Sequence, residues 1–364
     1  MEMQVPGFKN IHNRFKLNGY HFSRENLNDV AYTFIKEGKP HEREIGNFLL
    51  DWLDQKDYVE VQTSGSTGAP KRIRLDKNKM VNSAIATGNH FKLEVGDRAL
   101  HCLSANYIAG KMMLVRAMIL GLEIDIVPPD KYPLLYNEKE YDFCAMVPMQ
   151  VKYSLEELHR VKKIIVGGAP LTPGLKAELQ SIPSYIYETY GMTETITHIA
   201  SRKVNKFKKG KEYTYFKVMS GVNISTDDRS CLVIDAPNVS DEKVVTNDVV
   251  NLLSKRKFEW LGRIDNAINS GGIKLFPERI EAKLDTIKKP YFVTGMPDEN
   301  LGEKVVLIVE CAKEEVVALV KKQIEEAGLE KYEKPKEVIA LQKFVRTLND
   351  KIIRTETLAL IEKS

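Results

Sequence analysis

Cysteine is scarce in this chain, and no two cysteines are close together in the sequence. The 364 residues include four cysteines, which lie far apart in the sequence and form no C-x-x-C motif: Cys102, Cys144, Cys231 and Cys311. That spacing argues against both a disulfide framework and a cysteine-ligated metal site. We therefore expect a protein of a reducing, cytoplasmic compartment.

Long apolar runs are also missing. No such run approaches the roughly 18 residues that a membrane-spanning helix needs. The opening residues, MEMQVPGFKN, lack the apolar core of a signal peptide. We expect neither a membrane span nor a secretion signal.

Neither sign of charge dominates the chain. It carries 54 Lys and Arg against 50 Asp and Glu, a net charge of +4. A nucleic-acid-binding protein usually presents a denser basic face, so nucleic acid is not an expected partner. The 43% of hydrophobic residues in a chain of this length can bury a large core and build more than one domain.

The most informative stretch is TSGSTGAPK, at 63–71, which follows a strand-like run at Tyr58–Gln62. Its glycines let backbone amides converge on one point, its hydroxyls add donors, and its lysine adds a positive charge. The stretch predicts a phosphate-binding loop, with an ordinary Ser/Gly-rich loop as the alternative. It is not a Walker A loop, because no Ser or Thr follows the lysine, and it is not G-x-G-x-x-G.

Strand and helix patterns alternate after this loop. Apolar runs bounded by turn residues predict strands at 98–103, 123–127, 142–147 and 163–166. An apolar helix is predicted over 111–120, between the first two of these strands. Strand, helix, strand is the order of a parallel sheet, whose ligands bind at the carboxyl ends of the strands.

Two further helices have recognisable signals. Residues 41–53 place apolar side chains at helical spacing, and Asp76 is suited to cap a helix that runs to about Phe91. Ser154 and Glu157 have the spacing of a capping box for a short helix.

Four downstream segments stand out: GGAP at 167–170, YETYGMTE at 187–194, LGRIDNAINSGGIKLFPERIE at 261–281 and RTLNDKIIR at 346–354. Tyr190 offers a flat face on which a base can stack. Glu194 offers the hard carboxylate oxygen that Mg²⁺ prefers. The alternative for this pair is an aromatic turn with a surface glutamate.

In this order, the segments resemble the signatures of the acyl-adenylate-forming enzymes, the superfamily of acyl-CoA synthetases, luciferases and peptide-synthetase adenylation domains. The resemblance covers about 58–364. It implies an α/β fold with a large N-terminal adenylation domain, 1–264, of mixed β-sheets and flanking helices. A small mobile α+β domain, 265–364, would follow a hinge near Asp265 and carry the catalytic lysine.

The resemblance also implies a role for each matching residue. Catalysis falls to Lys351, Glu194 and Thr193, with Glu194 as the Mg²⁺ ligand. The acyl substrate would meet Tyr107, Arg116, Thr197 and His198, although a core tyrosine and a structural salt bridge are the alternatives for the first two. ATP and CoA would meet Thr63, Ser64, Gly65, Ser66, Thr67, Gly68, Lys71, Gly167, Gly168, Ala169, Glu188, Thr189, Tyr190, Gly191, Met192, Asp248, Arg263, Gly271 and Gly272.

This sequence departs from the family pattern at three places. Asn247 replaces the glycine before Asp248, which is tolerable at a turn with positive φ. Val345 replaces a proline, and Asp350 replaces the glycine before Lys351. The last change puts the rate of the first reaction step in question.

The implied activity is that of an AMP-forming acid–thiol ligase, which joins a carboxylic acid to CoA through an acyl-AMP and consumes ATP with Mg²⁺. Within the superfamily, SANYIAGKMMLVRAMILG at 104–121 resembles the o-succinylbenzoate–CoA ligase group of menaquinone biosynthesis. The alternatives are another acyl- or aryl-CoA ligase, an adenylating enzyme with a carrier-protein acceptor, and a non-catalytic nucleotide-binding module. A homodimer is possible under each.

Overall fold

The computed structural model describes residues 6–62, 72–207, 214–312, 314–346 and 352–361. The predicted phosphate loop at 63–71 and the predicted catalytic Lys351 lie outside the described residues. In the described ranges, no helix is long and apolar enough to cross a membrane.

The chain begins with a pair of packed helices, α1 (Arg24–Glu37) and α2 (Pro40–Leu53). The prediction of α2 is confirmed. The sequence analysis missed α1, whose fully buried side chains, Leu27 and Ala31, stand among polar residues. Its N-terminus is capped by Ser23, whose hydroxyl accepts a hydrogen bond from the amide of Asn26 at 3.3 Å.

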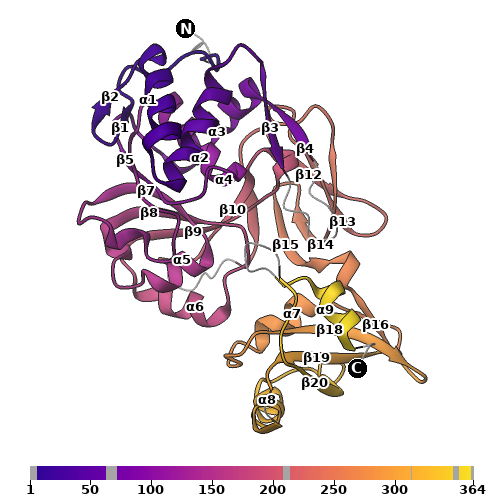
Figure 1. Cartoon of the computed structure of the whole chain (residues 1–364). Coiled ribbons are helices and arrows are strands. Elements are labelled where there is room, and N and C mark those ends of the chain that lie inside the picture. Colours follow the sequence, from indigo (N-terminus) through magenta and orange to yellow (C-terminus); the bar gives the residue numbers. More distant parts are fainter. Residues whose placement is uncertain (1–5, 63–71, 208–213, 313, 347–351, 362–364) are drawn as a thin grey trace.

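A thirteen-stranded sheet forms the centre of the molecule (Figure 1). Its parallel half contains, in spatial order, β1 (Lys16–Leu17), β6 (Glu123–Ile126), β5 (Arg98–His101), β7 (Tyr141–Met146), β8 (Val161–Val166) and β9 (Tyr185–Gly191). The short β2 (Tyr20–His21) pairs with β1 at the edge. The prediction of a parallel sheet built from strand–helix–strand units is confirmed.

The other half of the sheet is antiparallel. It continues from β9 through β10 (His198–Lys203), β11 (Phe216–Val218), β15 (Lys257–Arg263), β14 (Val244–Ser254), β13 (Cys231–Asp235) and β12 (Asn223–Thr226). A separate hairpin pairs β3 (Tyr58–Gln62) with β4 (Arg72–Asp76), the strands that flank the predicted phosphate loop. The two halves of the large sheet therefore meet where β9 pairs with β10.

Both faces of the parallel half are covered, as its near-continuous apolar strands require. Along β7, Phe143 and Ala145 point to one core, while Cys144 and Met146 point to the other. The first core is closed by α1, α2, α3 (Lys77–Phe91) and α4 (Ile108–Leu120), and the second by α5 (Pro148–Tyr153) and α6 (Pro173–Glu178). The central helix α4 is apolar nearly all round, so it is buried over most of its length.

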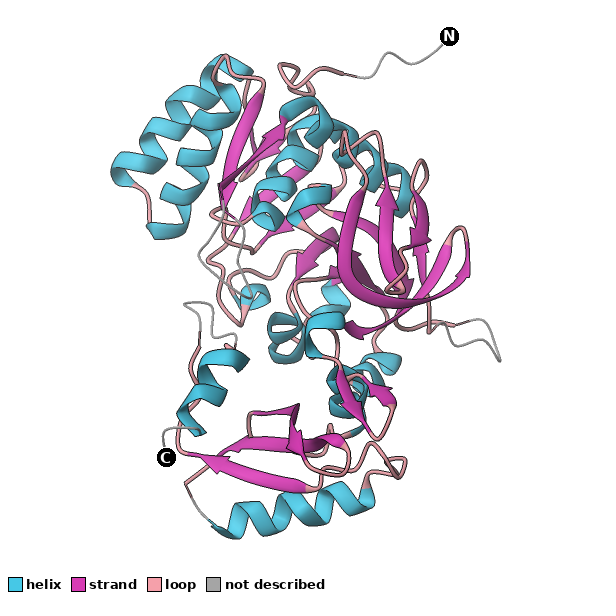
Figure 2. Ribbon diagram, turned by 90° about the vertical axis from the view of Figure 1, so that its right-hand side faces the viewer, coloured by secondary structure: helices cyan, strands magenta, loops and turns pink. Residues whose placement is uncertain are grey.

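The chain then forms a second, smaller sheet after β15. It contains β17 (Ile273–Leu275), β16 (Ile268–Ser270), β19 (Gly302–Glu310), β18 (Tyr291–Asp298) and β20 (Glu337–Leu341). Helices α7 (Pro277–Lys283) and α8 (Glu314–Glu326) cover one face, and α9 (Arg354–Ile361) packs on the other. Figure 2 shows this sheet between the long α8 and the C-terminal helix.

Two local predictions need correction or addition. Ser154 and Glu157 form no capping box, because Ser154 ends α5 and its buried hydroxyl has no partner within the described residues. The turn that follows is a single 3₁₀ turn at Leu158–Arg160. Cys102, directly after β5, and Cys144, on the neighbouring β7, bring their sulfurs to 3.6 Å as free thiols, although they lie far apart in the sequence.

His101 is buried at the end of β5, and this burial should make the stability of the protein depend on pH. Its Nε2–H donates to the carbonyl of Gly110 at 3.2 Å, since a carbonyl can only accept, and its Nδ1 has no partner among the described residues. Burial lowers the pKa of His101 from 6.5 to about 4. The unfolded chain therefore takes up this proton first as the pH falls.

We expect the free energy of unfolding to decrease between pH 6.5 and pH 4, by about 3 kcal/mol from His101 alone. His101→Gln keeps a donor for Gly110 but cannot be protonated, so urea unfolding across this range should show a smaller pH slope. The control, His159→Gln, changes an exposed histidine and should keep the full slope. Equal slopes for His101→Gln and the unaltered protein would contradict this account.

Candidate active site

The carboxyl ends of β8 and β9 bring two of the predicted segments together. β8 ends at Val166 and leads directly into Gly167 and Gly168. The hydroxyl of Thr189 on β9 donates to the carbonyl of Val166 at 3.1 Å. A Cβ atom on Gly167 would lie 2.8 Å from that hydroxyl, and Gly168 has φ of +85°. Glycine is therefore required at this turn by both space and backbone conformation.

Tyr190 joins this edge to the antiparallel half of the sheet. Its hydroxyl donates to Oδ2 of Asp248 at 2.6 Å, and the indole of Trp260 donates to Oδ1 at 3.1 Å. Burial, and then the Asp248 carboxylate, raise the pKa of Tyr190. Asp248 on β14 lies opposite Arg263 on β15. Three residues that the resemblance assigns to the nucleotide, Tyr190, Asp248 and Arg263, thus gather at one place.

Trp260 was missed by the sequence analysis. It lies on β15 beside the GR pair of the third segment, on the same side of the strand as Phe258, and that alternation was the available signal. The ring of Tyr190 packs edge-on against Phe258 at 5.2 Å between centroids. Aromatic packing therefore fixes the plane of the tyrosine before any base can stack on it.

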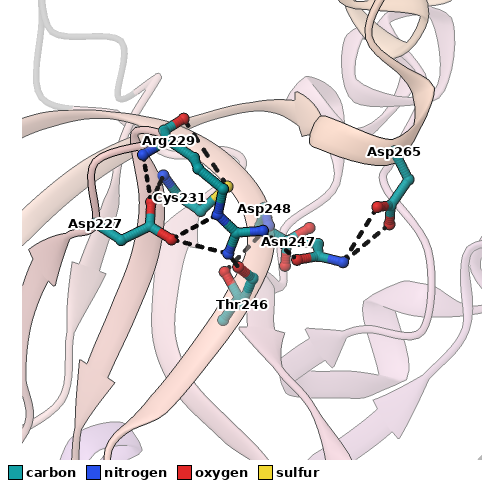
Figure 3. A network of polar contacts seen from close by, with 7 residues as sticks. All are labelled: Asp227, Arg229, Cys231, Thr246, Asn247, Asp248 and Asp265. Carbon is teal, nitrogen blue, oxygen red and sulfur yellow. Dashed lines mark hydrogen bonds and ion pairs between the residues drawn. The ribbon is translucent and has the colours of Figure 1, made fainter.

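A polar network surrounds Asp248 (Figure 3). Its neighbour Asn247 donates from Nδ2 to both carboxylate oxygens of Asp265 at 3.2 Å, and Arg263 donates to the same carboxylate at 2.8 Å. Arg229, also missed by the sequence analysis, donates to Oδ1 of Asn247 at 3.2 Å. Asn247 lies inside β14 and has no positive φ, so the predicted turn at this position is wrong.

The segment after β9 is a strained turn. Thr193 and the exposed Glu194 lie in a 3₁₀ turn, Thr193–Thr195. Ile196 then adopts φ of +65° and ψ of −54°, and the amide of Thr197 donates to the carbonyl of Thr195 at 2.7 Å. This is a γ-turn with positive φ, an unfavourable conformation for a β-branched residue. Its place between Glu194 and Thr197 fits the observation that strain gathers at functional sites.

Arg116 is a buried cation that has no anionic partner among the described residues. Its side chain is 1% exposed, and within the described ranges no carboxylate lies at ion-pair distance from it. Nη2 donates to the hydroxyl of Thr197 at 3.1 Å, whereas the buried Nε has no partner among the described residues. Burial lowers the pKa of Arg116 to about 9. Because a buried charge is costly when unpaired, this guanidinium is a candidate receptor for an anionic group.

His198 lies next to this cation. Burial, and then the positive charge of Arg116, hold the pKa of His198 well below 6.5. Its ring contacts the hydroxyls of Thr197 at 3.2 Å and Thr87 at 3.3 Å. The structure therefore brings together three of the residues predicted to meet the acyl substrate, Arg116, Thr197 and His198. Tyr107 lies at the N-terminal end of α4 and is 40% exposed.

Gly271 and Gly272 form the tight turn between β16 and β17, with φ of +58° and +80°. Two residues with positive φ are typical of a β-hairpin of this length. Two arginines that form ion pairs, Arg346 and Arg354, lie before and after Lys351 in the sequence. Arg346 donates to both oxygens of Glu310 at 2.6 Å, and Arg354 donates to Glu281 at 2.9 Å.

Glu188 has its carboxylate oxygens occupied. Its side chain accepts hydrogen bonds from Arg202 at 2.8 Å and the amide of Leu171 at 3.1 Å, and it pairs with Lys176 at 3.1 Å. Burial alone would favour the protonated acid, but the two cations lower the pKa of Glu188. We assign this residue to the support of the β8–β9 edge, although the resemblance would place it at the nucleotide.

This assignment predicts that Glu188→Gln costs stability and spares nucleotide binding. The amide keeps the shape of the side chain but leaves Arg202 and Lys176 without an anion. We expect a loss of about 2 kcal/mol in unfolding free energy, below the ~3–5 kcal/mol for a fully buried pair because both cations are partly exposed. Urea unfolding measures it, and KM for ATP should stay within about twofold.

The matched control is Glu60→Gln, which breaks the exposed pair with Arg74. Exposed pairs contribute about 0–1 kcal/mol, so its effect should be small. A rise in KM for ATP with unchanged stability in Glu188→Gln would return Glu188 to the nucleotide site.

The architecture is shared with known proteins. The model of the AMP-binding enzyme family matches residues 39–228. An acyl-CoA synthetase (AMP-forming)/AMP-acid ligase II-like protein from Dyadobacter fermentans is 33% identical, with 92% of this chain and 98% of that chain covered and a TM-score of 0.60.

Two further relatives carry names of one activity. The 2-succinylbenzoate–CoA ligase of Bacillus cereus is 24% identical over 343 residues, which cover 83% of this chain and 70% of that protein. The o-succinylbenzoate CoA synthetase of Bacillus subtilis, solved with its acyl-adenylate intermediate, has a TM-score of 0.73 at 22% identity, covering 82% of this chain and 68% of that one. At this identity, the last match shows the fold. The family match covers more than half of the chain, so the chain belongs to the AMP-binding enzyme family, as an adenylate-forming ligase of the acyl-CoA synthetase type.

Proposed function

We propose that this protein joins an aromatic dicarboxylic acid, o-succinylbenzoate, to CoA in menaquinone biosynthesis, with ATP and Mg²⁺. In the first step, a carboxylate oxygen of the acid forms a bond to the α-phosphorus of ATP and pyrophosphate leaves. In the second step, the CoA sulfur forms a bond to the acyl carbon, AMP leaves with the electron pair, and the thiol proton passes to solvent. The observation that carries the choice of acid is the buried Arg116, which has no anionic partner in the part of the chain that the structure describes.

The nucleotide end of this site is supported by Tyr190, Asp248 and Arg263. Each oxygen of Asp248 already accepts one hydrogen bond, from Tyr190 and Trp260. A carboxylate has about four lone-pair positions, so two remain for the ribose hydroxyls. The existing hydrogen bonds hold the carboxylate in place, and its two remaining acceptor positions can serve the ribose hydroxyls.

The phosphate end rests on Glu194 and on residues beyond the described ranges. The exposed carboxylate of Glu194 suits Mg²⁺, which prefers oxygen ligands and, when bound, offsets negative charge on the phosphates. We propose that the loop at 63–71 holds the phosphates, that Thr193 bonds the α-phosphate, and that Lys351 stabilises the charge that develops in the first step.

The choice of a diacid follows from charge. One carboxylate of such an acid is consumed in the reaction, and the second stays ionised. A buried guanidinium without an anion offers that second group a charge-assisted, two-point contact. Thr197, at 3.1 Å from Nη2, supports the receptor from the segment that also carries Glu194. Relatives named for 2-succinylbenzoate, which is such a diacid, favour the same choice.

We also propose that the chain works as two units, 1–264 and 265–364, which turn about Asp265. Sheet membership changes between β15 and β16, and Asp265 lies in the 3₁₀ turn between them. Such a turn would let Lys351 serve the first step and the Gly271–Gly272 turn approach CoA in the second. Two reaction steps in one site, each with different residues, give a reason for a mobile second unit.

The direct test is pyrophosphate release with ATP and Mg²⁺ over a panel of carboxylic acids, each with and without CoA. We expect multiple turnovers with o-succinylbenzoate only when CoA is present. Sustained release with another acid would replace the diacid assignment. Release that depends on a carrier protein instead of CoA would favour the alternative acceptor.

A variant separates the two steps. Lys351→Ala should slow pyrophosphate release strongly but spare thioester formation from supplied acyl-AMP, whereas Lys343→Ala, an exposed lysine nearby, should change neither. Equal losses in both steps for Lys351→Ala would contradict the two-unit proposal.

Arg116 gives the sharpest prediction about the acid. Arg116→Met keeps the buried volume and removes the charge, and the lost hydrogen bonds to a carboxylate are worth about 1.5–3 kcal/mol. KM for o-succinylbenzoate should therefore rise about 10- to 100-fold. KM for 3-benzoylpropionate, the same acid without its ring carboxylate, should not change. Equal effects on the two acids would refute the receptor role.

A further inference from the structure

A chain of buried hydrogen bonds leads away from Arg116 into the core. It passes from the guanidinium to Thr197, on to His198 at the start of β10, and ends at Thr87 and Ser83 on α3. Thr87 is fully buried, and His198 is 8% exposed. Neither Thr87 nor Ser83 has a signal of its own in the sequence, since both lie on an ordinary amphipathic helix.

The direction of these hydrogen bonds is fixed at the end that lies on α3. The hydroxyl of Thr87 donates its single hydrogen to the carbonyl of Ser83 at 2.9 Å. Toward His198, Thr87 can therefore only accept, so Nε2 of His198 must carry the proton at 3.3 Å. Because the ring is buried beside a cation, it is neutral, and its Nδ1 is left as a bare acceptor.

The hydrogen bonds next to Arg116 follow from the same assignment of donors and acceptors. Nδ1 of His198 accepts the hydrogen of the Thr197 hydroxyl at 3.2 Å. The oxygen of Thr197 is then free to accept from Nη2 of Arg116 at 3.1 Å. Every hydrogen in the chain thus points from Arg116 toward the carbonyl of Ser83, and reversing any one of them would leave two donors or two acceptors face to face.

We infer that Thr87 and His198 are positioning residues that fix Thr197 as an acceptor and thereby orient the Arg116 guanidinium toward the second carboxylate of the substrate. This inference rests on the proposed function of Arg116. It removes His198 from acid–base chemistry, because one ring nitrogen donates to Thr87 and the other is occupied by Thr197. Specificity for a diacid then depends on a helix residue, Thr87, that does not contact the substrate.

The protein offers a matched control for this relay, the series of hydrogen bonds from Arg116 to Ser83. His90 on α3 and Ser201 on β10 form a second histidine–hydroxyl hydrogen bond, at 2.8 Å, between the same two elements. It resembles the Thr87–His198 contact in kind and place but does not lead to Arg116. Ser201→Ala therefore reports what the loss of one such bond does to the packing of α3 on β10.

The first measurement is kinetic. Thr87→Val keeps the side-chain shape and removes the acceptor for Nε2 of His198. We expect KM for o-succinylbenzoate to rise about 5- to 20-fold, with KM for 3-benzoylpropionate, KM for ATP and kcat unchanged. Thr87→Ser, which keeps the hydroxyl, should restore the original KM, and Ser201→Ala should leave both acids unaffected.

The second measurement needs no substrate. ¹⁵N NMR of the histidine rings should show His198 as the neutral tautomer protonated at Nε2 at pH 7. A ring protonated at Nδ1, or an imidazolium, would overturn the direction of the relay whatever the kinetics show.

The outcomes separate this inference from the function on which it rests. If Arg116→Met affects both acids equally, the receptor role fails and the relay loses its purpose. If Arg116→Met discriminates between the acids while Thr87→Val behaves like Ser201→Ala, the receptor stands and the relay is wrong. Discrimination by both variants, with rescue by Thr87→Ser, supports the relay.

Discussion

The site depends on one close approach of two backbones, where the parallel half of the sheet meets the antiparallel half. A Cβ atom on Gly191 would lie 2.3 Å from the carbonyl oxygen of Thr197 and 2.5 Å from the Cα of His198. No side chain fits at such distances, so β9 and β10 can meet there only through glycine. The motif glycine was expected to admit a nucleotide, and in this structure it admits the neighbouring strand.

This approach has a consequence for both substrates. Tyr190, immediately before Gly191, belongs to the cluster with Asp248 and Arg263. His198, which begins the opposing strand, and Thr197 just before it belong to the cluster with Arg116. The γ-turn at Ile196 completes the reversal between them. The two clusters are thus neighbours because one strained turn and one glycine hold the strands together.

Buried charge distinguishes support from recognition in this molecule. Glu188, on β9, and Arg116, on α4, are both buried. Glu188 has two cations and an amide as partners, so its charge is satisfied by the fold itself. Within the described ranges, the partner of Arg116 is the neutral hydroxyl of Thr197. The fold tolerates the cost of the second arrangement, and the reason we propose is an anion that arrives with the substrate.

The sequence by itself determined the family, the parallel sheet and most of its elements, because these depend on local signals. Asp76 caps α3 with its carboxylate, and the apolar runs of β7 and β8 are buried on both faces, as local chemistry predicts. The motif segments, including TSGSTGAPK, could be recognised from residue type and spacing for the same reason.

Only the tertiary structure decided which side chains meet. The contacts of the site join residues that are far apart in the sequence. The separation is 12 positions for Trp260 and Asp248, 18 for Asn247 and Asp265, and 111 for Thr87 and His198. Nothing local marks them, since a hydrogen-bond partner is set by how strands register and helices pack. The environment of Arg116 could not be predicted either, although the residue itself was a candidate from the sequence. Its lack of an anionic partner among the described residues is a property of everything that surrounds it.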